Sequence, residues 1–265
     1  MSECVGDLWG EYLRAGRRMS DHTVEAYLGD LRSLLDYLGL GWQVAPARLG
    51  EELTQRRIRS WLADTLARGG ARSTIARHAA AIRNFTAWAV REEILACDPA
   101  AALTSPRADQ RLPAALDESD TRLLINLARS EALEGGPAQV RSWAILEITY
   151  ACGLRVSEVC ALDVSSLNRE TLTVRVLGKG NKERVVPYGA PAAHALDHWL
   201  VRARPRLVTA SSGEALFLGD RGGRIDPRVV RSMVHKMAAK ARVHDIAPHG
   251  LRHSAATHVL SGGAD

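Results

Sequence analysis

A stretch with little apolar periodicity in the middle of the sequence sets the strongest limit on the fold. Residues 97–113 contain three prolines, and a proline cannot continue a helix or take a place in a central strand. Helical patterns lie on both sides of this stretch, and 265 residues are enough for two domains of ordinary size. The sequence therefore predicts a domain at residues 1–96, a linker at 97–113 and a second domain at 114–265.

Three helical patterns fill the first of these domains. One begins at Ser20, a residue type that often caps helices, and ends at Gly39. Another runs from about Thr54 to Leu66, and we expect Ser73 to cap the third. The first domain is therefore predicted to be all-α.

The second domain is predicted to be helical with one β-hairpin. Between residues 171 and 187 the apolar period changes to two, and residues 178–181 have the composition of a turn. Helical patterns occupy the rest of the domain, near residues 116–134, 143–152, 190–201 and 227–241, with a last one opening at Pro248. The expected fold class is mainly α with a small β-hairpin or sheet, in a two-domain architecture.

The positive charge of the chain points to an anionic partner. The net charge is +5, and only four of the 35 basic residues are lysine. Arginine presents a planar fork that binds phosphate at two points, so nucleic acid is the first partner to consider. The alternative explanation of the arginine excess is a GC-rich genome, whose codon usage favours arginine over lysine.

The charge is unevenly distributed within the first domain. Residues 53–91 carry eight arginines against a single acid, Asp64. Near the expected start and body of the third helix lie Arg68, Arg72, Ser73, Arg77 and Arg83, where a helix N-terminus also attracts anions. We predict that these five residues contact DNA; an ordinary solvated basic helix face is the alternative.

The cysteines and the N-terminus indicate a cytoplasmic protein. The four cysteines are scattered without a C-x-x-C pair, which is typical of a reducing compartment. Acidic residues interrupt the N-terminal segment where a signal peptide needs an apolar run, and no apolar stretch is long enough to cross a membrane.

Four cationic or imidazole side chains of the second domain stand at constrained points of the chain. Arg155 follows Gly153, Lys179 lies between two glycines at the hairpin tip, and His249 and Arg252 share one face of the last helix. Three of them have a simpler explanation: an Arg155–Glu158 ion pair, a solvated turn lysine at Lys179, and a histidine satisfied at a helix start at His249.

A metal site is not expected. His249, His253 and His258 have helical spacing, but no H-E-x-x-H pattern and no acid accompanies them.

Three segments of the second domain carry more information together than any one of them alone. They are YACGLRVSE at residues 150–158, LGKGNKER at 177–184 and PHGLRHSAATH at 248–258. In order and spacing they resemble the signature segments of the tyrosine site-specific recombinases, the phage integrase family, and most closely the Xer branch of the XerC type. The resemblance covers nearly the whole chain and implies a helical, SAM-like core-binding domain followed by a catalytic domain.

The resemblance implies a role for each of the four side chains. Arg155 and Arg252 correspond to the arginines that grip the scissile phosphate, Lys179 to the general acid of the hairpin and His249 to the first histidine of its motif. Two guanidiniums can neutralise the charge that develops on a phosphate, so no cofactor is expected.

The resemblance also implies partners. They are double-stranded DNA with a dif-like recombination site, a second, XerD-like recombinase in a heterotetramer and a DNA translocase of the FtsK type, with no membrane. The alternatives are a phage or transposon integrase with the same chemistry and a non-catalytic DNA-binding protein.

The sequence departs from the family pattern at the nucleophile. The family places its catalytic tyrosine after the helix of His249 and Arg252, but all five tyrosines precede that helix, at positions 12, 27, 37, 150 and 188. Residues 261–263 favour the end of a helix, and the last two residues resemble the cap of another. We therefore expect a truncated chain that binds DNA without cleaving it.

Overall fold

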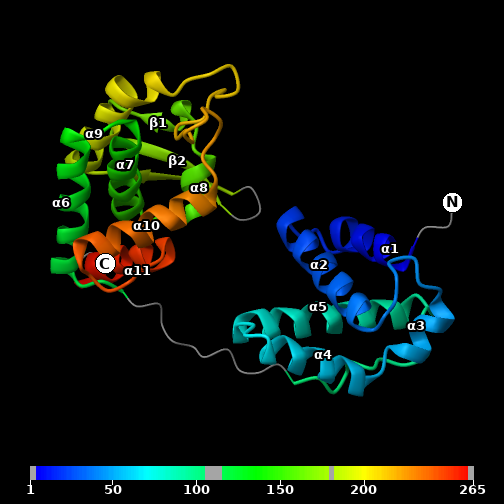
Figure 1. Cartoon of the computed structure of the whole chain (residues 1–265). Helices are drawn as coiled ribbons and strands as arrows, with labels where there is room; N and C mark the ends of the chain where they lie inside the picture. Colours follow the sequence, from blue (N-terminus) through cyan, green and yellow to red (C-terminus); the bar gives the residue numbers. More distant parts are fainter. Residues whose placement is uncertain (1–3, 105–114, 179–181, 262–265) are drawn as a thin grey trace. The chain divides into compact units, whose positions relative to one another are not determined.

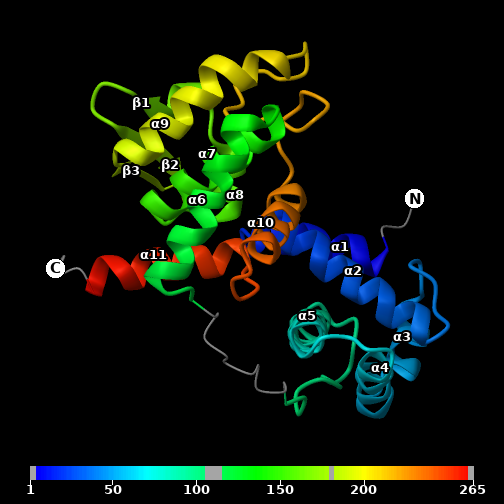
Figure 2. The same ribbon diagram turned by 60° about the vertical axis from the view of Figure 1, so that its left-hand side comes forward.

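The computed structural model describes residues 4–104, 115–178 and 182–261, with side chains as far as 258 in the last helix. The chain divides into two compact units, Met1–Gln110 and Arg111–Asp265, each with a hydrophobic core of its own. The expected fold class is confirmed, because both units are mainly helical and the second carries a small antiparallel sheet (Figures 1 and 2). None of the helices described is both long and apolar enough to cross a bilayer.

The first unit is built from helices around an aromatic core. Their bounds are α1 (Val5–Glu11), α2 (Asp21–Tyr37), α3 (Pro46–Glu52), α4 (Gln55–Ala67) and α5 (Arg72–Arg91), with a π-helical turn at Tyr12–Gly16. Helix α5 packs against α2 and α4, and Trp9, Trp61 and Phe85 are at most 2% exposed. The rings of Trp9 and Phe85 meet edge to face with centroids 5.2 Å apart, a favourable aromatic geometry.

Two of the three expected helix starts in this unit are confirmed. The side chains of Ser20 and Thr54 cap α2 and α4 by accepting backbone N–H bonds. The expected cap at Ser73 is wrong: Ala71 is the N-cap of α5, so Ser73 lies inside the first helical turn. Gly69, with φ of +84°, turns the chain early enough for α5 to begin at Arg72. The sequence patterns missed α1 and α3, which have seven residues each.

The beginning of the expected linker packs into the first unit. Ala100 and Leu103 are buried in its core. Arg83 Nη1 donates to the carbonyl of Leu103 at 2.8 Å, and Asp98 accepts the backbone N–H of Ala100 at 2.8 Å. Residues 105–113 of the expected linker lie outside the described residues.

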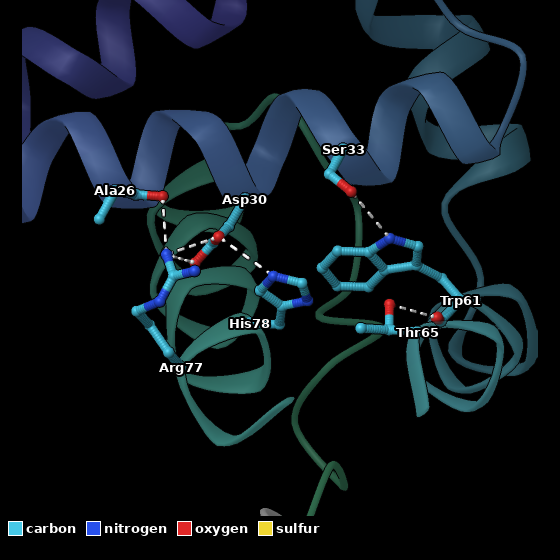
Figure 3. Close-up of polar contacts among 7 residues, drawn as sticks. All are labelled: Ala26, Asp30, Ser33, Trp61, Thr65, Arg77 and His78. Carbon is cyan, nitrogen blue, oxygen red and sulfur yellow. Dashed lines mark hydrogen bonds and ion pairs between the residues drawn. The ribbon is translucent and has the colours of Figure 1, made fainter. Parts of the chain in front are cut away.

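A buried carboxylate joins α2 to α5 (Figure 3). Asp30 accepts Arg77 Nη1 at 2.7 and 2.8 Å on its two oxygens, and His78 Nε2 lies 3.3 Å from Oδ1. Burial, partly offset by Arg77, raises the pKa of Asp30 to about 6. Burial, followed by the charge of Arg77, lowers the pKa of His78, whose ring stacks on Trp61 with centroids 4.6 Å apart.

The second unit surrounds a central helix, α7. Its helices are α6 (Glu118–Glu134), α7 (Pro137–Cys152), α8 (Val156–Ala161), α9 (Ala190–His198), α10 (Pro227–Ala241) and α11 (Pro248–Ser261). Helix α7 is buried from Val140 to Thr149, and α6, α9 and α11 pack against it. Helix α10 contacts α6, α8 and α11 (Figure 2). A helix covered on all sides is expected where the sequence shows a strongly apolar run.

The predicted hairpin is confirmed and gains a short third strand. Its strands are β1 (Leu167–Asn168), β2 (Thr173–Leu177) and β3 (Glu183–Pro187), in the order β1-β2-β3 and antiparallel. Val176 on β2 is 1% exposed and lies opposite Arg184 on β3. Because directly opposed residues share a face of a sheet, this register turns Arg184 toward the interior of the unit.

The Asp30 cluster yields a pH-dependent test of the first unit. We expect Arg77→Gln to lower the free energy of unfolding by about 2 kcal/mol near pH 8, since it leaves a buried carboxylate ionised without its partner. Asp30, with a pKa raised to about 6, is mostly neutral near pH 5, so the loss should largely disappear there. Denaturant unfolding at the two pH values measures the difference.

Arg56→Gln on α4 is the matched control, because Arg56 is exposed and carries the same charge. An equal destabilisation by Arg77→Gln at both pH values would contradict the role assigned to the Asp30 carboxylate.

Candidate active site

Arg155 stands at a fixed junction between two helices. Helix α7 ends at Gly153, which adopts the left-handed conformation with φ of +57°, as the sequence predicts. Arg155 is the N-cap residue of α8 and has an extended backbone, with its carbonyl accepting the N–H of Val159 at 3.0 Å. Its side chain is 52% exposed. The guanidinium therefore leaves the chain at a defined point and reaches solvent on one side.

The carboxylate of Glu158 is the centre of the site. Its side chain is 4% exposed, and each oxygen accepts two hydrogen bonds. Oε1 accepts Arg155 Nη1 at 2.8 Å and Arg184 Nη1 at 3.0 Å. Oε2 accepts the backbone N–H of Arg155 at 2.8 Å and Arg184 Nη2 at 2.8 Å. The Arg155–Glu158 ion pair, considered above as the simpler explanation of Arg155, is thus present, and Arg184 adds a two-point contact.

Arg252, on α11, approaches the same carboxylate without bonding to it. Its Nη1 lies 3.8 Å from Glu158 Oε2, and this buried atom has no hydrogen-bond partner among the residues that the structure describes. The Arg252 side chain as a whole is 30% exposed. The structure thus brings Arg155 and Arg252 together around Glu158.

The charges of Glu158 and the three arginines around it favour the binding of an anion. Burial raises the pKa of Glu158, but the bonds from Arg184 and Arg155 outweigh it and hold the pKa at about 2. Burial, and then the neighbouring charge of Arg155, lower the pKa of Arg252. Three guanidiniums therefore face one ionised carboxylate, and a phosphate group would compensate the excess positive charge.

Of the other two expected catalytic residues, the structure describes His249 but not Lys179. His249 is exposed in the first turn of α11, one turn before Arg252. Lys179 lies outside the described residues, although the hairpin is described up to Gly178, whose N–H donates to the carbonyl of Lys182 at 2.7 Å.

The five arginine and serine positions expected to contact DNA divide into two groups. Arg68, Arg72 and Ser73 are exposed around the junction of α4 and α5, and Arg68 Nε pairs with Asp64 at 2.9 Å. Arg77 and Arg83 bind Asp30 and the carbonyl of Leu103 within the first unit. The guanidiniums of Arg77 and Arg83 thus have partners within the first unit, although the Arg77 side chain is still 42% exposed. The DNA contacts expected of these residues stay a prediction.

Arg184 is the site residue that sequence reasoning missed. It belongs to the segment LGKGNKER at 177–184, but only Lys179 was singled out there. The alternation of β3 was a usable signal, because it places Arg184 and Val186 on the face opposite the exposed Val185. The contact with Glu158 depends on the tertiary packing of β3 beside α8.

The sequence matches known families and proteins. The model of the phage integrase family matches residues 115–265, and that of the phage integrase N-terminal SAM-like domain matches residues 7–93. Tyrosine recombinase XerC of Mycobacterium sp. (strain JLS) is 49% identical over 264 residues, which cover 99% of this chain and 87% of the relative. XerC of Mycobacterium tuberculosis is 50% identical with the same coverage.

Solved structures share the fold at low sequence identity. XerH recombinase bound to difH before cleavage is 16% identical, with a TM-score of 0.70 over 100% of this chain and 77% of that chain. A lambda integrase dimer bound to a COC′ core site is 15% identical, with a TM-score of 0.69 over 98% of this chain and 70% of that chain. At this level of identity the likeness concerns the fold alone.

The pKa of Glu158 predicts how stability depends on acid. A folded-state pKa of about 2, against an ordinary value of 4.5, means that the ionised carboxylate stabilises the second unit above pH 4.5 and loses this effect toward pH 2. We expect the unmodified chain to lose on the order of 3 kcal/mol over that window, and Glu158→Gln to lack this component.

Denaturant unfolding across the acid range measures the effect. Glu183→Gln is the control, because Glu183 is exposed on β3 and its removal should leave the acid dependence unchanged. Superimposable pH profiles of Glu158→Gln and the unmodified chain would show that the assigned carboxylate does not stabilise the fold.

Proposed function

Because the chain belongs to the phage integrase family as a XerC-type tyrosine recombinase, a class that breaks and rejoins DNA, we propose that it is a site-specific recombinase of the dif type. The observation that carries the proposal is that Arg155 and Arg252 converge on the carboxylate of Glu158, whose two oxygens each already accept two hydrogen bonds. This arrangement leaves positive charge exposed at one place in the second unit. We call Arg155 and Arg252 together the phosphate cradle, because two adjacent guanidiniums can bind a DNA phosphate.

The first part of the proposed mechanism is phosphate binding. Arg155 and Arg252 hold the non-bridging oxygens of the scissile phosphate and neutralise the charge that grows on them in the transition state. Glu158 keeps Arg155 in place through both its backbone N–H and its guanidinium. Positioning and charge neutralisation account for most of the catalysis that phosphoryl transfer requires.

The second part is covalent transfer. A tyrosine hydroxyl oxygen attacks phosphorus and gives its proton to His249, while the bond from phosphorus to the 5′ oxygen breaks. Lys179 donates a proton to that leaving oxygen, which becomes a 5′ hydroxyl. The 3′-phosphotyrosyl ester keeps the energy of the broken bond, so the reverse steps rejoin strands without ATP.

The tyrosines within these 265 residues have other contacts. Tyr150 OH and His258 Nδ1 are 2.9 Å apart, and Tyr188 is 6% exposed. Tyr12 accepts a hydrogen bond from Arg91, and Tyr37 bonds to Ser60. The ring of Tyr27 stacks on that of Trp9. We therefore propose that this 265-residue chain binds DNA but forms no covalent intermediate through its own tyrosines.

The proposal extends to the cellular role. The support for the resolution of chromosome dimers at a dif-type site comes from XerC-type relatives at 49% and 50% identity. The proposed partners are a XerD-like recombinase in a heterotetramer and a DNA translocase of the FtsK type, in the cytoplasm. The proposed DNA contacts of the first unit are Arg68, Arg72, Ser73, Arg77 and Arg83, of which all but Arg83 are exposed.

The phosphate cradle can be tested by DNA binding. We expect Arg252→Gln to weaken binding of a dif-type duplex roughly tenfold, the effect of losing a charged hydrogen bond. The dependence of log Kd on log salt should also fall by about one. Fluorescence anisotropy at several salt concentrations measures both.

Arg169→Gln is the control for this test, because Arg169 forms an exposed pair with Asp197. If Arg252→Gln binds the duplex with unchanged affinity and salt dependence, DNA binding relies on other basic surface, as in a non-catalytic DNA-binding protein.

Covalent chemistry is tested with a nicked suicide duplex that traps the phosphotyrosyl ester. We expect no protein–DNA adduct from the 265-residue chain on denaturing gels, since its tyrosines are engaged elsewhere. A XerC relative with its own nucleophile serves as the positive control. An adduct that mass spectrometry maps to Tyr150 or Tyr188 would overturn the proposal.

A further inference from the structure

Arg184 has no assigned part in the proposed reaction, yet it makes the most extensive side-chain contact with Glu158. We propose that Arg184 is a positioning residue: it occupies the Glu158 carboxylate so that Arg252 remains available for the phosphate. This inference rests on the proposed function, because it concerns the same phosphate cradle. It assigns Arg184 an effect on phosphate affinity that acts through Glu158 and Arg252.

The first step of the argument is the hydrogen-bond capacity of Glu158. A carboxylate offers about four lone-pair sites, and the four bonds from Arg155 and Arg184 fill them. Arg184 supplies two of the four, one to each oxygen. Arg252 is held at 3.8 Å from Oε2, beyond hydrogen-bond distance, because the acceptor sites are already in use.

The second step is the state in which this leaves Arg252. Its Nη1 is buried and has no hydrogen-bond partner in the described part of the chain. A buried donor without a partner is costly, and the cost falls when an anion binds. The Arg252 guanidinium, which is not hydrogen-bonded to Glu158, therefore remains available for a phosphate oxygen.

The third step is the rigidity of Arg184. It lies opposite Val176 in the register of β2 and β3, and its side chain is 35% exposed. Its planar fork contacts both carboxylate oxygens at 2.8 and 3.0 Å, which fixes the orientation of the carboxylate as well as its charge.

Removal of Arg184 has a definite expected consequence. Two acceptor sites on the ionised Glu158 open, and the nearest unsatisfied donor is Arg252. We expect Arg252 to move onto Glu158 and to become neutralised by it. The cradle then loses an arginine for phosphate although Arg155 and Arg252 are both present.

The test measures inorganic phosphate binding to the full 265-residue chain by NMR. The Nε–Hε signal of Arg252, identified by its loss in Arg252→Lys, reports both its free environment and its response to phosphate. In Arg184→Gln we expect this signal to be shifted before phosphate is added and the affinity for phosphate to be roughly tenfold lower. Arg184→Lys keeps the charge but not the two-point contact, so it should also weaken binding.

Two further variants separate this effect from a loss of charge. Arg175→Gln removes an arginine from the neighbouring strand β2, where the side chain is exposed, and should leave phosphate affinity near that of the unmodified chain. In the double variant Glu158→Gln with Arg184→Gln, the carboxylate that captures Arg252 is absent. We expect this double variant to recover most of the affinity lost in Arg184→Gln.

The outcomes distinguish the inference from the proposed function. If Arg252→Gln leaves phosphate affinity unchanged, the cradle itself is refuted. If Arg252→Gln weakens binding but Arg184→Gln and Arg184→Lys do not, or if the double variant shows no recovery, the role of Arg184 is refuted. Thermal unfolding of each variant identifies any that fails to fold, and Arg184→Lys then decides the question alone.

Discussion

The saturation of one buried carboxylate organises the functional part of this molecule. Glu158 accepts four hydrogen bonds from Arg155 and Arg184, which holds the start of α8 against strand β3. Because its acceptor sites are filled, Arg252 of α11 stays near the carboxylate without bonding to it. Helix α8, strand β3 and helix α11, which are separate in the sequence, thereby meet at the carboxylate of Glu158. The three arginines carry more positive charge than this one carboxylate neutralises, and Arg155 is 52% exposed. The proposed phosphate binding rests on this excess of positive charge.

The first unit contains a buried carboxylate with the opposite electrostatic result. Asp30 receives bonds from one nitrogen of Arg77, and burial raises its pKa to about 6. Glu158 receives bonds from two arginines and a backbone N–H, and its pKa is held at about 2. The number of donors on each carboxylate decides whether burial or hydrogen bonding prevails. Asp30 therefore serves packing between α2 and α5, whereas Glu158 stays ionised and orders a cationic site.

The arginines show where sequence reasoning succeeds and where it stops. Arg155 and Arg252 were identified from their segments, and the structure brings them together around Glu158. Arg77 and Arg83 looked equivalent to Arg68 in the charge pattern, but they bind groups inside the first unit. Local charge density is visible in a sequence. The acceptor that each guanidinium finds is not, because those acceptors lie on elements distant in the chain.

The sequence by itself determined the family, the mainly helical fold class, the hairpin and most long helices, since periodicity, caps and turn residues act over a few neighbours. It placed the start of α5 at Ser73 and missed the two seven-residue helices, because short elements depend on packing more than on local pattern. The tertiary structure alone decided that Arg184 faces Glu158 and that Nη1 of Arg252 has no hydrogen-bond partner among the described residues. The physical reason is that the number of hydrogen bonds on Glu158 depends on every donor that reaches it. Those donors come from different elements, and strand register and helix packing decide which of them reach the carboxylate.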